Sequence, residues 1–161
     1  MSYTFTEVQT FPIDETFDRL YADSIDDMVG GTVRFGDSNQ RELIIEFLNG
    51  VSYAHMKNIV VESNDIPCMY LQCRFVDNTL TWVNAIVGKI NNSKAWCATS
   101  EFHQANKDFI TSLGGNSWAV ECLKDAAIDN FFTTLNTAGI CLGTLEETDL
   151  ENNIKLMKWT Y

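Results

Sequence analysis

Hydrophobic positions along this chain follow two spacings, and the change from one spacing to the other marks the predicted elements. Short runs rich in β-branched and aromatic residues predict strands, whereas apolar residues three and four positions apart predict amphipathic helices. Asp77-Asn78 predicts a tight hairpin between two long β-rich runs. The predicted strands span residues 3–10, 58–62, 67–76, 79–89, 94–99, 117–123, 140–146 and 153–160.

Two helices are predicted in the first half of the chain. The first begins after Asp14 and ends at Gly30-Gly31, and the second begins near Ser38-Asn39 and ends at Gly50. Asn39 and Glu42 have the spacing of a capping box. The apolar faces of these helices are Phe17, Leu20, Tyr21, Ile25 and Met28, and then Leu43, Ile44, Phe47 and Leu48.

Two more helices are predicted in the second half, each between strands. Ser100 is expected to cap the third helix and Asp125 the fourth, which Gly139 ends. Their apolar faces are Phe102, Ala105, Phe109, Ile110 and Leu113, and then Ile128, Phe131, Phe132, Leu135 and Ala138. Because no repeat, linker or low-complexity segment interrupts this order, we expect a single domain over residues 1–161.

Composition narrows the classes of function. Hydrophobic residues make up 45% of the 161 residues, enough for a full core and against wholesale disorder. The net charge of −11, with lysine and arginine scattered singly, argues against binding to nucleic acid or to anionic lipid. Residues 1–30 lack the pattern of a signal peptide, and no apolar stretch has the length of a bilayer span.

The five cysteines form no CxxC pair. We expect free thiols in a reducing compartment. Cys97, Glu101 and His103 are close in sequence, and two interpretations are open for them. One is a Cys/His nucleophile pair or a metal corner, and the favoured one is a buried cysteine followed by a histidine in the first turn of a helix.

Two further groups of residues have ordinary explanations. Trp82, Trp96, Trp118 and Trp159 could form a stacking platform, but each lies in an apolar run, which favours core packing. The acidic tip at 146–151 lacks the spacing of a calcium loop and is expected to be a solvated hairpin. We therefore predict no metal site.

The order of the predicted elements resembles the GNAT fold of N-acetyltransferases. The match is best over residues 117–161, where a helix ends in Ala-Gly-Ile and the last strand reads Lys-Leu-Met-Lys-Trp-Thr-Tyr. The resemblance implies an α/β fold with a mixed, mostly antiparallel sheet and helices on both faces. The segment 95–101, Ala-Trp-Cys-Ala-Thr-Ser-Glu, is also similar to one in the acetyltransferase-like internal virion proteins of short-tailed phages.

Catalysis in the GNAT family uses acetyl-CoA, and this sequence departs from the family pattern at the residues involved. The family holds the pyrophosphate in a glycine-rich loop, whereas residues 97–105 contain no glycine or arginine and include Glu101. The position of the tyrosine that protonates the leaving thiolate is Phe132 or Leu135, neither of which can donate a proton. Glu62 and Glu121 are candidates for the general base.

These departures lead to a leading hypothesis and two alternatives. The leading hypothesis is a non-catalytic GNAT-like phage protein without a cofactor, which binds other proteins in the internal core or portal region of the virion. It would be found in the virion or the host cytoplasm. A weaker alternative is an acidic mimic of nucleic acid that inhibits a host factor, which rests on the net charge of −11 alone.

The enzymatic alternative is an active N-acetyltransferase with an atypical cofactor loop. Acetyl-CoA would be held by backbone groups at the start of the third helix, and the cofactor would enter between strands 94–99 and 117–123. The residues expected at that cofactor site are Ala98, Thr99, Ser100, Phe102 and His103.

Overall fold

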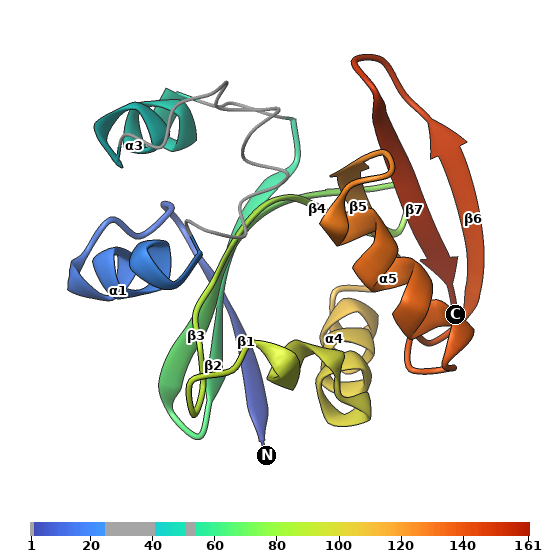
Figure 1. Ribbon diagram of the computed structural model, residues 1–161, viewed down its shortest axis with the longest axis horizontal. Helices are drawn as coiled ribbons and strands as arrows, with labels where there is room; N and C mark the ends of the chain where they lie inside the picture. Colours follow the sequence, from blue (N-terminus) through green and yellow to red (C-terminus); the bar gives the residue numbers. More distant parts are fainter. Residues whose placement is uncertain (1, 25–40, 51–53) are drawn as a thin grey trace.

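Seven strands form one mixed sheet in the computed structural model, which describes residues 2–24, 41–50 and 54–161 (Figure 1). All neighbouring strands are antiparallel except β4 and β5, which are parallel and are joined through a helix. This arrangement confirms the predicted α/β class with a mostly antiparallel sheet. The order across the sheet is β1 (Tyr3–Val8), β2 (Met56–Ser63), β3 (Ile66–Val76), β4 (Thr79–Val87), β5 (Ser117–Leu123), β7 (Ile154–Thr160) and β6 (Thr144–Asp149).

Helices cover both faces of the sheet, as predicted (Figure 1). On one face, α1 (Glu15–Ser24) and α3 (Arg41–Gly50) bury an apolar cluster against β3 and β4. On the other, α4 (Ser100–Ser112) and α5 (Ala127–Thr137) enclose a larger cluster. The first cluster includes Phe17, Leu20, Ile44, Leu48, Tyr70 and Ile86, and the second includes Leu71, Trp82, Phe102, Trp118, Phe132 and Trp159. Core packing of the four tryptophans is confirmed, since each is at most 5% exposed.

Local signals located the turns correctly. Asp77 and Asn78 both have positive φ angles, of 51° and 61°, as a tight hairpin between two twisted strands requires. Gly139 follows the end of α5 with a φ of 75°, a conformation that costs glycine little. All five cysteines are free thiols, and all except Cys97 are buried.

The strand predicted at 94–99 is wrong. This segment contains a 3₁₀ helix, η2 (Ala95–Ala98), with hydrogen bonds from Cys97 N to Lys94 O and from Thr99 N to Trp96 O. Only Trp96 is buried, and its indole N–H donates to Gly88 O at 3.0 Å. Periodicity cannot distinguish a buried strand from a short helix in an apolar run of this length.

Both helix caps predicted in the second half are also misplaced. Thr99, not Ser100, is the N-cap of α4, and its hydroxyl accepts from Phe102 N at 3.4 Å. Asp125 does not cap α5, because it adopts a φ of 62° and its own N–H donates to Asp129 Oδ2 at 2.8 Å. Ala126 is the N-cap of α5, and no side chain of the described residues accepts a hydrogen bond from the first turn of this helix.

The closing hairpin begins later than predicted. β6 starts at Thr144 rather than at residue 140, because Gly143 has a φ of 89° and its Cα approaches Thr160 O too closely for a side chain. The tip falls at residues 150–153, where Asn152 and Asn153 have positive φ angles. The predictions for Ile25, Met28, Gly30-Gly31 and the capping box beginning at Asn39 lie outside the described residues.

Candidate functional site

β4 and β5 run side by side for only four residue pairs. Residues 79–82 pair with residues 117–120, after which the two strands separate although both continue. At the same place Gln72 and Cys73, adjacent on β3, oppose Asn84 and Trp82 on β4, which leaves Val83 as an extra residue. An extra residue of this kind is a β-bulge, which bends its strand and increases the local twist. The bulge therefore turns the end of β4 away from β5.

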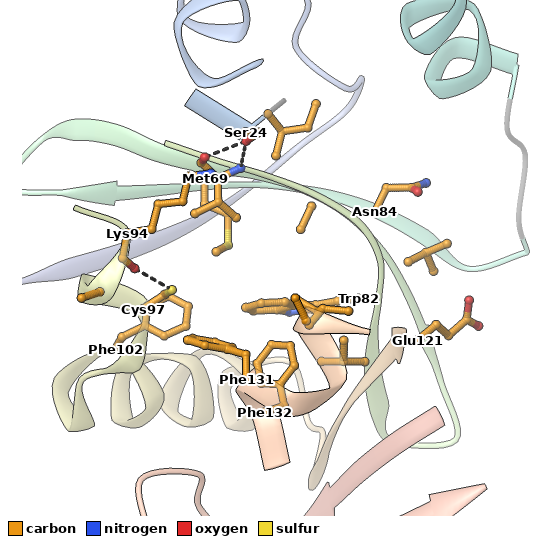
Figure 2. Close-up of a pocket in the computed structure, with 18 of the residues that line it drawn as sticks. Ser24, Met69, Trp82, Asn84, Lys94, Cys97, Phe102, Glu121, Phe131 and Phe132 are labelled. Atoms are coloured by element: carbon orange, nitrogen blue, oxygen red, sulfur yellow. Dashed lines mark hydrogen bonds between the residues drawn. The ribbon is translucent and has the colours of Figure 1, made fainter. Parts of the chain in front are cut away.

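A cleft of about 430 Å³ occupies the space between the separated strands (Figure 2). Its walls come from β3, β4, β5, η2, α4 and α5, and they are mainly apolar. The apolar lining includes Met69, Val87, Phe102, Val120, Phe131 and Phe132. The polar residues among those that line it are Ser24, Asn84, Lys94, Cys97 and Glu121. A concave, mostly apolar volume with a few polar groups is typical of sites for small molecules and cofactors.

The separated part of β4 presents an open edge to the cleft. Ala85 is exposed although it lies in a strand at the centre of the sheet. Its neighbours Asn84 and Ile86 are buried. Ala85 pairs with Leu71 on β3 but has no counterpart on β5, since the β4–β5 pairing ends at Trp82. A central strand is thus accessible from one side.

Ser24, the last residue of α1, bonds to this edge. Its hydroxyl donates to Val87 O at 2.6 Å and accepts from Val87 N at 2.8 Å. Both backbone groups of one strand residue point to the same side, and residues two apart point alike. Because Val87 points to the open side, the backbone N–H and C=O of Ala85 are directed there as well. Ser24 therefore occupies one position of the edge and leaves the next one facing the cleft.

Lys94 and Cys97 lie at one end of the cleft, beside the start of α4 (Figure 2). The thiol of Cys97 donates to Lys94 O at 2.9 Å, and burial raises its pKa to about 11. His103 is 2% exposed, and its Nε2 lies 3.0 Å from Cys97 O. Burial lowers the pKa of His103 to about 4, so the ring is neutral near pH 7. A protonated thiol and a ring engaged by a carbonyl do not form a nucleophile pair.

The residues predicted for a cofactor site divide into two groups. Phe102 lines the cleft, whereas Ala98, Thr99, Ser100 and His103 are not among the lining residues. The Thr99 hydroxyl is engaged in capping α4 and also donates to Trp96 O at 2.8 Å. Glu101, which the sequence placed where a pyrophosphate would sit, is exposed and does not line the cleft. Water screens a charge in that position, which weakens any repulsion of an anion.

Asn84 and Glu121 lie at the other end of the cleft (Figure 2). Glu121, on β5, forms an ion pair with Arg74 Nη2 at 3.3 Å, and its side chain is 13% exposed. Glu62, the other candidate for a general base, is on β2 and does not line the cleft. The structure thus places one of the two proposed carboxylates in the cleft.

The wall formed by α5 carries no acid. Ile128, Phe131 and Phe132 face the cleft, and Phe132 also packs on Trp118 with ring centroids 5.6 Å apart. Leu135, the other residue considered at the tyrosine position, is 6% exposed and lies in the core. None of these side chains can donate a proton.

Comparison with known proteins identifies the fold. No protein-family model matches the sequence, and no curated protein matches it either. Solved structures do match: the PaiA N-acetyltransferase of Thermoplasma acidophilum in complex with coenzyme A has a TM-score of 0.55 at 10% identity and covers 100% of both chains. The chain has the GNAT fold.

Two further GNAT-fold structures support this assignment. AAC(6')-Ib in complex with paromomycin and acetyl-CoA matches with a TM-score of 0.61 at 10% identity, over 99% of this chain and 94% of the other. A GNAT family acetyltransferase from Elizabethkingia anophelis with acetyl-CoA bound matches with a TM-score of 0.52 at 12% identity, over 99% of both chains.

These findings overturn the leading hypothesis. A non-catalytic phage virion protein without a cofactor is the wrong expectation, because the GNAT-fold structures named above are acetyltransferases solved with CoA or acetyl-CoA. The pair of strands expected to separate is also corrected. The strands that separate are β4 and β5, and η2 occupies residues 95–98 instead of a strand.

Several residues of the cleft were missed by the sequence analysis, namely Ser24, Asn84, Ala85 and Lys94. The signal for Asn84 was present, since an amide in the middle of a long apolar strand is unusual, whereas the roles of Ser24 and Ala85 depend on contacts distant in sequence. Among the described residues, no three His, Cys, Asp or Glu side chains come together as a metal site. No helix in the described part of the chain has the length and apolarity needed to cross a membrane.

Proposed function

We propose that this protein is an N-acetyltransferase that takes its acetyl group from acetyl-CoA. The observation that carries the proposal is the cleft between β4 and β5, which opens the sheet of a GNAT fold beside the N-terminus of a helix. The enzymatic alternative required an opening between residues 94–99 and 117–123, and the opening lies instead between β4 and β5. Of the three side chains that could have filled it, Trp96 and Trp118 are buried in the core and do not line it, whereas Phe132 lines it and leaves a volume of about 430 Å³.

The chemistry of the cleft fits the parts of acetyl-CoA. The pantetheine arm is a narrow chain with amide groups, and the backbone of Ala85 offers both a donor and an acceptor along the open edge of β4. The first N–H groups of α4 have no helical partners and carry the positive end of the helix dipole. That of Phe102 donates to the Thr99 hydroxyl, so those of Ser100 and Glu101 are the ones that would meet an anion. Lys94, at the same end of the cleft, supplies a positive charge that residues 97–105 themselves lack. Together they would hold the pyrophosphate without a glycine-rich loop.

Glu121 is the group in the cleft that could accept the proton of the amine. The amine nitrogen would attack the carbonyl carbon of the thioester, so that a C–N bond forms and the C–S bond breaks. The proton released from nitrogen would pass to the Glu121 carboxylate, directly or through one water. Because the α5 wall has no acid, the departing thiolate would take its proton from solvent.

Calorimetric titration of the full chain with acetyl-CoA tests the proposal. We expect a micromolar dissociation constant. The variant Ala85→Phe would fill the cleft from an exposed position, so we expect binding to weaken by at least about a hundredfold, or about 2.7 kcal/mol, with an unchanged melting temperature.

Val76→Phe is the matched control, because Val76 is also an exposed strand residue but does not line the cleft. It should bind acetyl-CoA like the wild type. Absence of binding at millimolar acetyl-CoA would overturn the proposal, and so would equal affinities for Ala85→Phe and the wild type.

A further inference from the structure

A chain of buried amide groups runs from α3 to the cleft. Gln72 Nε2 donates to Leu48 O at 3.1 Å, and Asn84 Nδ2 donates to Gln72 Oε1 at 2.7 Å. Gln72 is 1% exposed and Asn84 is 7% exposed. Apolar residues packed on α1 and α3, such as Tyr70 and Ile86, lie beside them on the same face of the sheet, and the buried Asn58 lies opposite Gln72. Buried amides of this kind are stable only when they are hydrogen-bonded.

The order of these bonds determines which way each amide points. Leu48 O can only accept, and it lies in the last turn of α3, where carbonyl groups have no helical partner. Gln72 must therefore turn its Nε2 toward Leu48 and its Oε1 toward Asn84. Asn84 must in turn present Nδ2 to Gln72. Its Oδ1 is then directed away from Gln72, and the residue that carries it lines the cleft.

We infer that Asn84 positions the acceptor amine, with its Oδ1 fixed by Gln72 and by the end of α3; this inference rests on the proposed function. Asn84 Oδ1 and the Glu121 carboxylate are at the same end of the cleft (Figure 2). Both are acceptors, so they suit a ligand that brings several N–H donors, as a protonated primary amine does. Asn84 would hold the ammonium group while Glu121 takes its first proton and passes it to water; the neutral amine then attacks, and Glu121 takes the second proton that leaves the nitrogen.

Two substitutions of Asn84 separate this role from a structural one. Asn84→Ala removes the acceptor, and we expect the KM for the probe 1,4-diaminobutane to rise about tenfold to hundredfold, the range for one hydrogen bond to a charged group. Asn84→Asp keeps an acceptor in the cleft, so its KM should stay below that of Asn84→Ala. If Asn84 served only to donate to Gln72, Asn84→Asp would be the worse variant, because it sets a carboxylate against Gln72 Oε1.

Two further variants test the chain of amides. Gln72→Met frees the Asn84 amide to turn, so the KM for 1,4-diaminobutane should rise, but less than in Asn84→Ala. Tyr70→Phe is the matched control. Tyr70 is on the same strand and face as Gln72, its hydroxyl bonds to Asp14, and it does not line the cleft. Tyr70→Phe should leave the KM unchanged, and all variants should bind acetyl-CoA within about twofold of the wild type.

The outcomes distinguish this inference from the proposed function. Acetyl transfer with an unchanged KM in Asn84→Ala would overturn the role of Asn84 and leave the enzyme intact. If no transfer occurs, the wild type and Asn84→Ala are titrated with 1,4-diaminobutane while the backbone N–H signals of residues 84 and 121, present in both proteins, are followed by NMR. Binding that weakens in Asn84→Ala, and that neutral 1,4-butanediol does not reproduce, would support the site without the reaction. No binding of the diamine, or equal binding of the diol, would overturn it.

Discussion

The two halves of β4 belong to one strand but have opposite surroundings. Residues 79–82 lie between β3 and β5, and Trp82 packs on Trp118 with ring centroids 5.0 Å apart. Residues 83–87 have only β3 beside them and border the cleft. The boundary between the halves is the bulge at Val83. The comparison shows that the site arises from an interruption of strand pairing rather than from a specialised loop.

Removing an aromatic ring that packs on the paired half should have the largest effect. Trp118 is 1% exposed and contacts the rings of Trp82, Phe132 and Trp159. Trp118→Ala would leave a large cavity, and we expect the free energy of unfolding to fall by about 3–5 kcal/mol. Denaturant unfolding followed by circular dichroism measures this change.

Phe131→Ala provides the contrast at the cleft. Phe131 is only half-buried and lines the cleft, so its removal mainly widens a space that water already reaches. We expect a loss below about 1.5 kcal/mol. Equal losses in the two variants would mean that the cleft wall is packed as tightly as the core, contrary to the comparison.

The parts of the fold that could be predicted from the sequence are those with local causes. Asp77 and Asn78 tolerate positive φ angles, so the hairpin between β3 and β4 could be located without tertiary information. The strand at 117–123 was predicted with its observed bounds, because Gly114-Gly115 and the following helix mark both ends. Signals of this kind act within a few residues and do not depend on tertiary contacts.

The site was predictable only in small part, because its geometry depends on pairing across the sheet. No feature of Val83 itself shows that it is the extra residue opposite Gln72 and Cys73. Attention to the missing glycines at 97–105 directed the prediction toward Glu101, which lies outside the cleft. The open edge at Ala85 can be recognised only when it is known that the pairing of β5 with β4 ends at Val120. A missing motif was therefore a poor guide to whether the sheet contains an open cleft.

His103 packs beside the paired half of β4, and its titration tests whether water has access to that part of the core. Its ring lies 5.5 Å from that of Trp118, and burial lowers its pKa from 6.5 to about 4. Below pH 6.5 His103 is protonated in the unfolded chain, whereas in the folded chain it stays neutral down to about pH 4. Stability should therefore fall as the pH drops through this window, by up to about 3 kcal/mol at about 1.36 kcal/mol per pKa unit.

The comparison of wild type with His103→Gln isolates this effect, because glutamine keeps an N–H donor for Cys97 O but does not titrate. Denaturant unfolding between pH 4 and 7 should show a steeper fall for the wild type than for the variant. If the stability of the two proteins changes equally with pH, water reaches His103, and the core beside the paired half of β4 is more hydrated than the structure indicates.

The smallest effect is expected at Ser24, which bonds to the end of the open half of β4. Ser24→Ala removes the hydroxyl from Val87 N and Val87 O, but water from the cleft can replace it, so the stability loss should be about 1 kcal/mol or less. Amide hydrogen exchange at Val87 should nevertheless accelerate, because its N–H then faces solvent. Ser112→Ala, which removes an exposed hydroxyl bonded to Phe109 O, is the control and should leave Val87 unchanged. If Val87 stays protected in Ser24→Ala, another group covers this edge, and the contrast between the halves of β4 is smaller than the hydrogen bonds imply.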